Sequence, residues 1–508
     1  MNNFLKNKKN IYLILIFFTI SCSILIKSYF NFNGYITPDS GYFLALADHL
    51  INGEGFLISA YEYGGGKNEF FSIWPVGYPL LIFFISELTN LEVFWSSKVV
   101  NIILLGFSFL ILNKLFKNNA YIYSLVFFFS SYIEILSFTW SENLFLFAII
   151  FFIYSLYKVI IVSNNLFINS FFLFSSCIAL FLSRYIGVFS IFVMFLIFIY
   201  FLFFKPHHKT KVFFLVIFFN IIFICAYFLN NIIETGAIRG SYDFPIESLD
   251  EVGFGFIFSL IKSLIVEFII PVHSIKSTES IFLAIIFFLL QVSIIILFYF
   301  KFKKQNKKIL FANNLPKLLI IFIIVGLSYL FFLIFLKILI PSIEGFGFRL
   351  LSPFTLILYF AIITYILQIQ NNKIKKYFLR SIFLLAFISF LLNVPIKTYY
   401  QTLKNPNNYI DNINVIKSQY KEVEKNSIVI FSERMHIRYL RNDIERLIPK
   451  HNEDWETFLY RIDPLNNKKK YLKIPFMSTE EKKIYHKSIL NKFSGYEIGK
   501  VININKIK

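Results

Sequence analysis

The sequence predicts an all-α polytopic membrane bundle of about eleven transmembrane helices, with interfacial helices on its outer side and a small C-terminal α/β domain. The chain has 508 residues, is 57% hydrophobic and contains 69 Phe. Its apolar runs repeatedly approach the ~20 residues that a helix needs to cross the bilayer core. Clusters of Lys separate these runs, so membrane orientation explains the formal charge of +20, and no nucleic-acid partner is predicted.

The predicted spans follow the apolar runs in order. They lie near residues 10–30, 96–116, 119–138, 142–162, 165–182, 185–204, 212–230, 279–300, 318–340, 350–369 and 380–397. The N-terminal lysines and the polar or basic breaks near 113–119, 205–209, 301–308 and 371–380 then fall on one side, which the positive-inside rule makes cytoplasmic. We therefore expect a multi-pass protein of the cytoplasmic membrane, with its first span a retained signal anchor.

Two further apolar stretches, within 76–92 and 254–272, are too short or too interrupted to count as spans. The stretch Val76–Ser86 has only about a dozen residues, a length typical of an interfacial or re-entrant segment. Lys262 and Glu267 interrupt the second stretch. We expect amphipathic helices at the outer interface, although the pattern leaves a spanning position open for both.

The chain is predicted to divide into a membrane domain, residues 1–398, and an extracytoplasmic α/β domain, residues 399–508. The tail opens with an Asn-rich linker near 405–414 and continues with a strand at 427–431. A capping-box pattern at 478–481 precedes a helix to about Phe493, and residues 496–507 alternate like a strand. The charged residues after the first strand, among them His436 and Arg438, are interpreted as a solvated helix face.

No metal or nucleotide site is predicted. Cys22, Cys177 and Cys225 lie inside apolar runs and lack the spacing of metal ligands or of a disulfide framework. The glycines of 64–67 lack the flanking strand and the spacing of a phosphate-binding loop, and we interpret them as a loop tip. A divalent cation is left open as an assisting ion, without a recognisable set of ligands.

Asp39 is the first candidate for chemistry because it lies just beyond the first span, at the start of a short amphipathic helix. Two interpretations are open. Asp39 or Ser40 caps the helix that begins near Tyr42, since Asp and Ser are favoured N-caps. Alternatively, a carboxylate at the outer water boundary acts as a general base that deprotonates an acceptor.

Three arginines, Arg184, Arg239 and Arg349, map to the outer boundary and so depart from the cytoplasmic bias of the basic residues. A guanidinium matches phosphate oxygens bidentately, which favours an anionic lipid head group as its ligand. Snorkelling or ordinary loop placement is the alternative. Glu142, at a predicted helix start, is open to three roles: orienting a catalytic group, binding a divalent ion, or favouring the helix dipole.

These candidates lie in segments whose order resembles the C-type (GT-C) integral-membrane glycosyltransferase superfamily, which includes protein O-mannosyltransferases and lipid A aminoarabinose transferases. In that family, a first outer loop holds an acidic residue, then an aromatic and small-residue helix that ends in Gly-x-Gly, and then a Pro-containing segment. Later helices begin or turn with further acidic and Arg motifs. The matching segments here are 39–55, 74–81, 139–145, 183–187 and 348–353, with a weaker match over 230–240.

The resemblance implies a glycosyltransferase that moves a hexose or pentose from a polyprenyl-phosphate donor to an acceptor glycan, lipid or protein on the extracytoplasmic side. It implies inversion at the sugar carbon, with Asp39 as the general base. Many family members carry an acidic pair at this point, whereas Ser40 follows Asp39 here, so a two-carboxylate mechanism is not implied. The other implied site residues are the phosphate-binding Arg184, Arg349 and Arg239, and the supporting Glu142, Tyr42 and Tyr185.

Two alternative functions remain open at this point. A polysaccharide polymerase or ligase acting on lipid-diphosphate-linked glycans also needs outer loops rich in Arg. A flippase or transporter of lipid-linked sugars should place ionisable residues deep within its spans and interrupt helices at mid-membrane. The charged residues here cluster near the ends of the spans, which disfavours transport.

Overall fold

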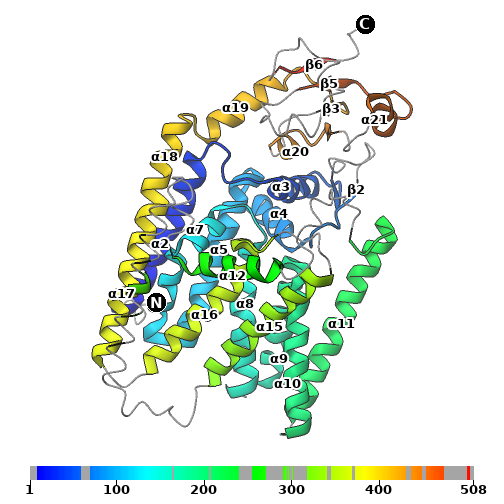
Figure 1. Ribbon diagram of the computed structural model, residues 1–508. Coiled ribbons are helices and arrows are strands. Elements are labelled where there is room, and N and C mark those ends of the chain that lie inside the picture. The colour runs from blue at the N-terminus through cyan, green and yellow to red at the C-terminus, as the bar shows by residue number, and fades with distance from the viewer. Residues whose placement is uncertain are drawn as a thin grey trace.

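The computed structural model describes residues 8–58, 69–162, 165–204, 208–239, 255–270, 317–339, 345–368, 372–430, 436–448, 454–473 and 500–503, with isolated positions between 286 and 300. Within these stretches, nine helical segments are long and apolar enough to cross a membrane. Figure 1 shows them side by side in a bundle, with short helices and the C-terminal domain gathered at one end. The predicted class, an α-helical polytopic membrane bundle, is confirmed.

The spanning helices pack their inner faces into one apolar core, which includes the fully buried Ile149, Val193 and Leu351. An α-helix satisfies its own backbone hydrogen bonds, which is why apolar runs of this length can cross lipid. The helices are α2 (Lys8–Phe30), α5 (Val93–Phe116), α8 (Glu142–Tyr157), α9 (Leu166–Ser183), α10 (Phe189–Phe204), α11 (His208–Thr235), α15 (Lys317–Leu339), α16 (Phe348–Gln368) and α17 (Asn372–Leu391). Among the short π- or 3-10 turns that adjoin these helices, η3 (Lys158–Val162) follows α8 and η4 (Tyr185–Val188) precedes α10.

The span predicted over 119–138 is not one continuous helix, because the structure breaks this region at Phe129, whose backbone is extended. Neighbouring segments satisfy the backbone that the break leaves free: Ser130 N donates to Ile270 O at 3.0 Å, and Asn393 Nδ2 donates to Ser130 O at 3.1 Å. Irregular backbone at membrane depth needs such protein partners. The pieces are η1 (Lys117–Asn119), α6 (Ala120–Ser124), η2 (Leu125–Phe128) and α7 (Ser130–Ser137).

The predicted count of about eleven spans is not confirmed. The broken region over 119–138 accounts for one difference. The span predicted at 279–300 lies outside the described residues, apart from scattered helical positions. The nine segments therefore refer only to the part of the chain that the structure describes.

Two short apolar helices, α4 (Gly77–Thr89) and α12 (Gly255–Phe268), have 13 and 14 residues. At ~1.5 Å per residue, neither reaches the ~30 Å of a bilayer core. Figure 1 shows α12 lying across the ends of neighbouring spanning helices, in agreement with the predicted interfacial placement. Its buried Glu267 accepts a hydrogen bond from Ser131 Oγ at 2.8 Å, which ties α12 to the start of α7.

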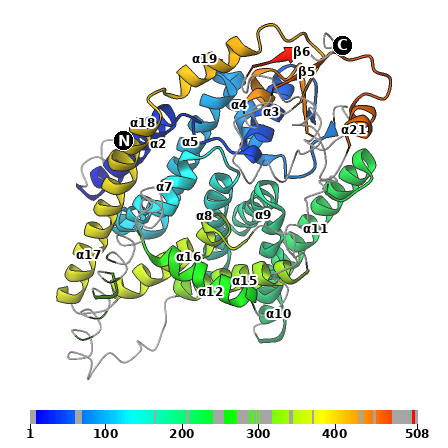
Figure 2. The same cartoon turned by 45° about the horizontal axis from the view of Figure 1, so that its top comes forward.

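The segment between α2 and α4 contains α3 (Pro38–Ile51) and a short antiparallel pair, β1 (Leu57–Ile58) and β2 (Glu69–Phe70), in which Leu57 lies opposite Phe70. Residues 40–47 of α3 are buried, because the helix packs against α4 and α5 on one side and against the C-terminal domain on the other. Figure 2, which brings this end of the molecule forward, shows α3 beside α4 and under the terminal domain.

The terminal region folds as a small α/β unit around a sheet with strand order β4-β3-β5-β6. The central strand β3 (Ile428–Ile430) runs parallel to β4 (Glu445–Leu447) and β5 (Lys470–Leu472), while β6 (Ile502–Asn503) is antiparallel to β5. The strand predicted at 427–431 is thus confirmed over Ile428–Ile430, while the helix predicted over 478–493 lies outside the described residues. The boundary at 398/399 stays a prediction. The helices of this region are η7 (Leu392–Ile396), α18 (Lys397–Lys404), α19 (Tyr409–Gln419), α20 (Ile437–Leu440) and α21 (Trp455–Ile462).

The linker predicted near 405–414 is wrong over most of its length, because α19 begins there. Asn408 caps this helix by accepting from Asp411 N, since Asn is a favoured N-cap as well as a loop residue. The ring of Tyr409 then stacks on Phe94 of α5 at 3.8 Å between centroids. Gly34 has φ +62, and a Cβ there would lie 2.5 Å from the Tyr409 ring. This close approach requires glycine.

Candidate functional site

The helix that carries Asp39 is capped by Thr37. The cap is therefore neither Asp39 nor Ser40, the two residues predicted for this role. The side chain of Thr37 accepts from Ser40 N, and Ser40 Oγ in turn accepts from Thr37 N at 3.0 Å, which makes a reciprocal capping box. Pro38 stands at the first helical position, where its missing N–H costs nothing. Asp39 is therefore released from capping, and its carboxylate points to another partner.

That partner is Arg349, at the start of α16. Asp39 Oδ2 accepts from Arg349 Nη2 at 2.8 Å, and Glu142 Oε1 accepts from Arg349 Nε at 2.7 Å. The same Oε1 atom also accepts from Arg184 Nη1 at the end of α9. These four residues, Asp39, Glu142, Arg184 and Arg349, form a continuous ionic array that joins α3, α8, α9 and α16.

The members of the ionic array differ in their exposure. The side chain of Glu142 is 2% exposed, while those of Arg349, Arg184 and Asp39 are 15%, 21% and 24% exposed. Oε2 of Glu142 has no hydrogen-bond partner among the described residues. The array therefore has a buried acid at its base and presents two guanidiniums and one carboxylate toward solvent.

A polar cradle fixes the turn that leads into Glu142. The fully buried Lys98 of α5 donates from Nζ to Ser137 O at 2.7 Å, and Asn101 Nδ2 donates to Phe138 O at 2.9 Å. These contacts occupy carbonyls that the end of α7 leaves without helical partners. The turn then presents Trp140, whose ring lies 4.4 Å from the guanidinium carbon of Arg349. Planar stacking of this kind suits Arg in particular.

Tyr185 and Arg239 lie next to the ionic array rather than within it. Tyr185 Oη donates to Ser72 O at 2.7 Å, and Arg239 Nε donates to Ile73 O at 3.2 Å. Both side chains thus hold the extended segment before α4. The aromatic ring of Trp74, the next residue, lies 5.4 Å from that of Tyr42. The structure therefore brings Tyr185, predicted as a supporting residue, and Arg239, predicted to bind phosphate, against one segment beside α3.

The terminal domain contributes a residue that sequence reasoning placed wrongly. Arg438 of α20 is 2% exposed, and its guanidinium carbon lies 4.0 Å from the ring of Tyr42, on α3. His436 is also buried, with Nε2 3.4 Å from Asn33 O, and burial lowers the pKa of its imidazole to about 4. The prediction of a solvated face is wrong for His436 and Arg438, because these two side chains are buried against Asn33 and Tyr42.

Lys98 and Trp140 were missed as contributors to the site. The sequence did contain a signal for Lys98, because Lys98 and Asn101 lie three residues apart within an apolar run. Polar side chains inside a span are costly and therefore face other protein groups. Trp140 and Arg438 carried no such signal. Their importance lies in stacking on Arg349 and Tyr42, far away along the chain.

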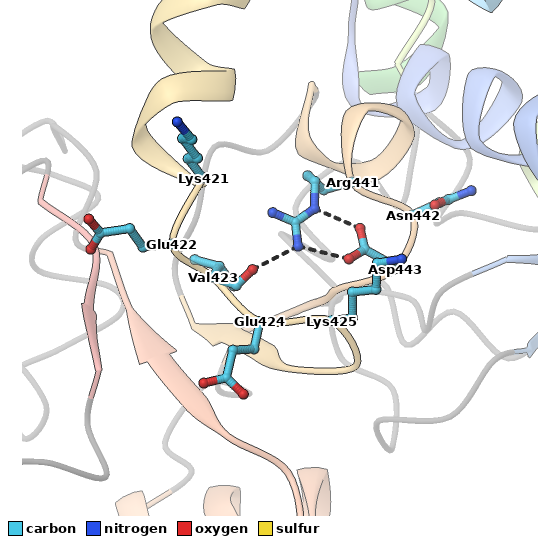
Figure 3. A pocket seen from close by; sticks show the side chains of 8 residues that line it. All are labelled: Lys421, Glu422, Val423, Glu424, Lys425, Arg441, Asn442 and Asp443. Atoms are coloured by element: carbon cyan, nitrogen blue, oxygen red, sulfur yellow. Dashed lines mark hydrogen bonds and ion pairs between the residues drawn. The ribbon is translucent and has the colours of Figure 1, made fainter.

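A separate hollow of about 620 Å³ opens in the terminal domain (Figure 3). Arg441 dominates it, donating to both carboxylate oxygens of Asp443 at 2.7 and 2.8 Å and to Val423 O at 2.9 Å. The hollow shares no residue with the ionic array. Across the part of the chain that the structure describes, no cluster of His, Cys, Asp or Glu could hold a metal ion.

Comparison with known proteins gives matches in structure. No family model matches the sequence, and curated proteins give no match either. The crystal structure of ArnT from Cupriavidus metallidurans in the apo state has a TM-score of 0.50 and 10% identity, over 91% of this chain and 92% of that one. The same ArnT bound to undecaprenyl phosphate gives 0.49 and 11%, over 91% and 93%.

The oligosaccharyltransferase of Archaeoglobus fulgidus in the apo form gives a TM-score of 0.51 and 11% identity, over 91% of this chain and 69% of its own. Identities this low concern the fold alone. ArnT and the archaeal enzyme are both GT-C glycosyltransferases, and each match extends over nearly all of this chain. This protein therefore has the fold of the C-type integral-membrane glycosyltransferases, as the order of its motifs predicted.

Proposed function

We propose that this protein is a membrane glycosyltransferase that moves a sugar from a polyprenyl-phosphate donor to an acceptor on the extracytoplasmic side of the cytoplasmic membrane. The ionic array carries the proposal. In this array the partly exposed carboxylate of Asp39 lies 2.8 Å from the guanidinium of Arg349. The buried Glu142 binds both Arg349 and a second guanidinium, that of Arg184. A base and two phosphate-binding groups are what transfer from a phosphate-activated sugar requires.

In the proposed reaction, Asp39 takes the proton from an acceptor hydroxyl or amine. The freed electron pair of the acceptor atom forms the new bond to the anomeric carbon. The bond from that carbon to the phosphate oxygen breaks, and its electron pair stays on the phosphate, which gains one negative charge. Arg184 and Arg349 stabilise that charge. Attack opposite the leaving phosphate inverts the sugar carbon, and Asp39 returns its proton to water.

The proposed orientation rests on where lysines lie in the bundle. Lys9, Lys114, Lys211 and Lys317 lie at ends of α2, α5, α11 and α15 that are opposite to the ionic array. The positive-inside rule makes that end cytoplasmic, which places Asp39 outside. The acceptor is then a glycan, lipid or protein of the cell envelope.

The proposed donor class is supported by one property of the site and by one structural neighbour. Guanidiniums at the end of an apolar bundle suit an anionic head group whose isoprenoid tail lies among the helices. ArnT, a structural neighbour, has been crystallised with undecaprenyl phosphate, a lipid of this class. Arg239, which donates to Ile73 O, is proposed to act on the donor less directly than Arg184 and Arg349.

The test uses the purified full chain in lipid nanodiscs, a set of labelled polyprenyl-phosphate sugars, and membrane extract as the acceptor source. Release of the lipid phosphate and labelling of the acceptor are measured together. Asp39→Asn should lower transfer by a factor of about 100 or more. Arg349→Gln should raise the donor KM, and Arg239→Gln should do so less.

Asp48→Asn serves as the matched control, because Asp48 lies on the same helix and bonds to Asn442 instead of an arginine. It should keep transfer near the wild-type rate. Full transfer by the Asp39→Asn protein would remove Asp39 as the base. Labelled polyprenyl-diphosphate glycans are assayed in parallel, and transfer from these donors alone, with release of the lipid diphosphate, would favour the polymerase or ligase alternative.

A further inference from the structure

Arg349 is shared between two carboxylates that come from different helices. Its Nη2 donates to Asp39 on α3, and its Nε donates to Glu142 on α8. One face of the guanidinium lies on the ring of Trp140. Two edges and one face of this side chain are thus held by three separate groups.

The two acids hold Arg349 with different strength. Glu142 is 2% exposed and also binds Arg184, so removing its contact leaves two charges without their buried partner. Asp39 is 24% exposed. Breaking a buried pair is strongly destabilising because it leaves an uncompensated buried charge, whereas a pair that solvent reaches contributes little. The contact with Asp39 is therefore the one that can be exchanged.

We propose that the donor phosphate and the Asp39 carboxylate compete for Nη2 of Arg349, so that Asp39 is released as a base only when an anionic donor engages this arginine. The inference rests on the proposed function and adds which residue decides the specificity for the donor. Phosphate and carboxylate oxygens both suit the guanidinium fork, and phosphate brings more acceptor oxygens to it. Arg349 then selects donors that carry an anionic phosphate.

Glu142 acts in this scheme as a positioning residue. Its Oε1 keeps Arg349 Nε and Arg184 Nη1 in place while Nη2 changes partner. Trp140 keeps the plane of the guanidinium. Oδ2 of Asp39, which accepts from Arg349 Nη2, becomes available to the acceptor proton through this exchange. Donor binding thus precedes deprotonation of the acceptor.

A double-mutant cycle tests the competition, with undecaprenyl phosphate as the probe and the full chain in nanodiscs. Equilibrium binding is measured for wild type, Asp39→Asn, Arg349→Gln and the double variant. Asp39→Asn should bind the probe about three to ten times more tightly, because the amide releases Nη2 at the cost of a weak pair. In the Arg349→Gln background, the change at Asp39 should have no effect.

Three controls define the result. Undecaprenol, which lacks the phosphate, should bind wild type and Asp39→Asn equally, and Asp48→Asn should match wild type. In a Glu142→Gln background, the Asp39→Asn change should no longer tighten binding, whereas a purely structural role of Glu142 would leave that tightening unchanged in the folded fraction. Asp39→Ser provides a second variant should the amide protein fail to accumulate.

Equal or weaker binding by both Asp39 variants overturns the competition, and so does tightening that persists without Arg349. These outcomes are distinct from failure of the proposed function. Wild type that neither binds the probe nor transfers sugar refutes the proposed function. Wild type that binds and transfers, with no tightening in the variants, refutes only the inference.

Discussion

The indole ring of Trp140 lies under the guanidinium of Arg349, while its Nε1 donates to Thr37 Oγ1 at 2.8 Å. One aromatic side chain thus joins the start of α16 to the cap of α3. The hydroxyl of Thr37 serves both the backbone of Ser40 and this indole. The cap is therefore also part of the site's support.

Replacing Thr37 by Ala should cost about 1 kcal/mol in the free energy of unfolding, because the N-cap is lost. The change should also lower sugar transfer, because Trp140 loses its hydrogen-bond acceptor and the first turn of α3 loses its cap. Thr37→Ser should restore both. The matched control is Asn408→Ala, which removes the equivalent cap of α19. If both Ala variants reduce transfer equally at equal thermal stability, Thr37 has no special link to the site.

Glu142→Gln should destabilise the protein far more than Asp39→Asn. The buried carboxylate serves two guanidiniums, and its loss should cost about 3–5 kcal/mol. The partly exposed Asp39 pair should cost about 1 kcal/mol or less. Thermal unfolding in detergent micelles measures both, with the exposed Glu87→Gln on α4 as control. Similar melting temperatures for the two variants would contradict the different burial assigned to these acids.

The buried His436 should make stability depend on pH. Burial lowers the pKa of His436 to about 4 in the fold, against about 6.5 when unfolded. Its contribution is complete above pH ~6.5 and is lost as the pH falls toward ~4, by about 3 kcal/mol in all. The measurement is the unfolding free energy of wild type relative to His436→Gln, which should shift in favour of the variant as the pH falls across this range.

Comparing the unfolding free energies of wild type and His436→Gln removes the opposing pH dependence of Asp48, which lies at the same interface. Burial and the nearby Glu54 raise the pKa of Asp48 to about 6, so Asp48 adds stability as the pH falls below ~6. This contribution is common to wild type and variant and cancels in the difference. A difference that stays constant with pH would show that His436 is not buried as an uncharged group.

Arg438→Lys should loosen the contact between the terminal domain and α3 even though it keeps the charge. The guanidinium carbon lies over the ring of Tyr42 at 4.0 Å, and an ammonium offers no planar group that could stack there. A desolvated cation–π contact contributes about 2 kcal/mol. The readouts are melting temperature and protease cleavage between bundle and terminal domain. Arg461→Lys, whose ring partner Phe458 is on the same helix, is the control and should leave cleavage unchanged.

The sequence indicated the spans well because the length of an apolar run is a local property. It indicated short interfacial helices at α4 and α12 for the same reason. It did not show the break at Phe129, whose stability depends on Ile270 and Asn393, more than a hundred residues away. Nor did it show that the charged run around Arg438 is buried, because such a run is usually solvated.

The candidate site divides in the same way. Asp39, Arg184 and Arg349 were singled out by their place at the outer boundary, and Glu142 by its place at a helix start. Asp39 and Arg349 are 310 residues apart, yet their side chains are 2.8 Å apart. A local sequence pattern carries no information about such a distance. Choosing between the three roles of Glu142 likewise required its contacts in space with Arg184 and Arg349.

By itself, the amino-acid sequence determined a membrane bundle, the acidic and basic residues near the ends of its spans, and the order of motifs that resembles one fold family. Only the tertiary structure decided that Thr37 is the cap, that Asp39 pairs with Arg349, and that the terminal domain packs on Tyr42. The physical reason is that hydropathy and capping act between near neighbours in the chain. Ion pairs and stacking act between neighbours in space, which packing alone selects.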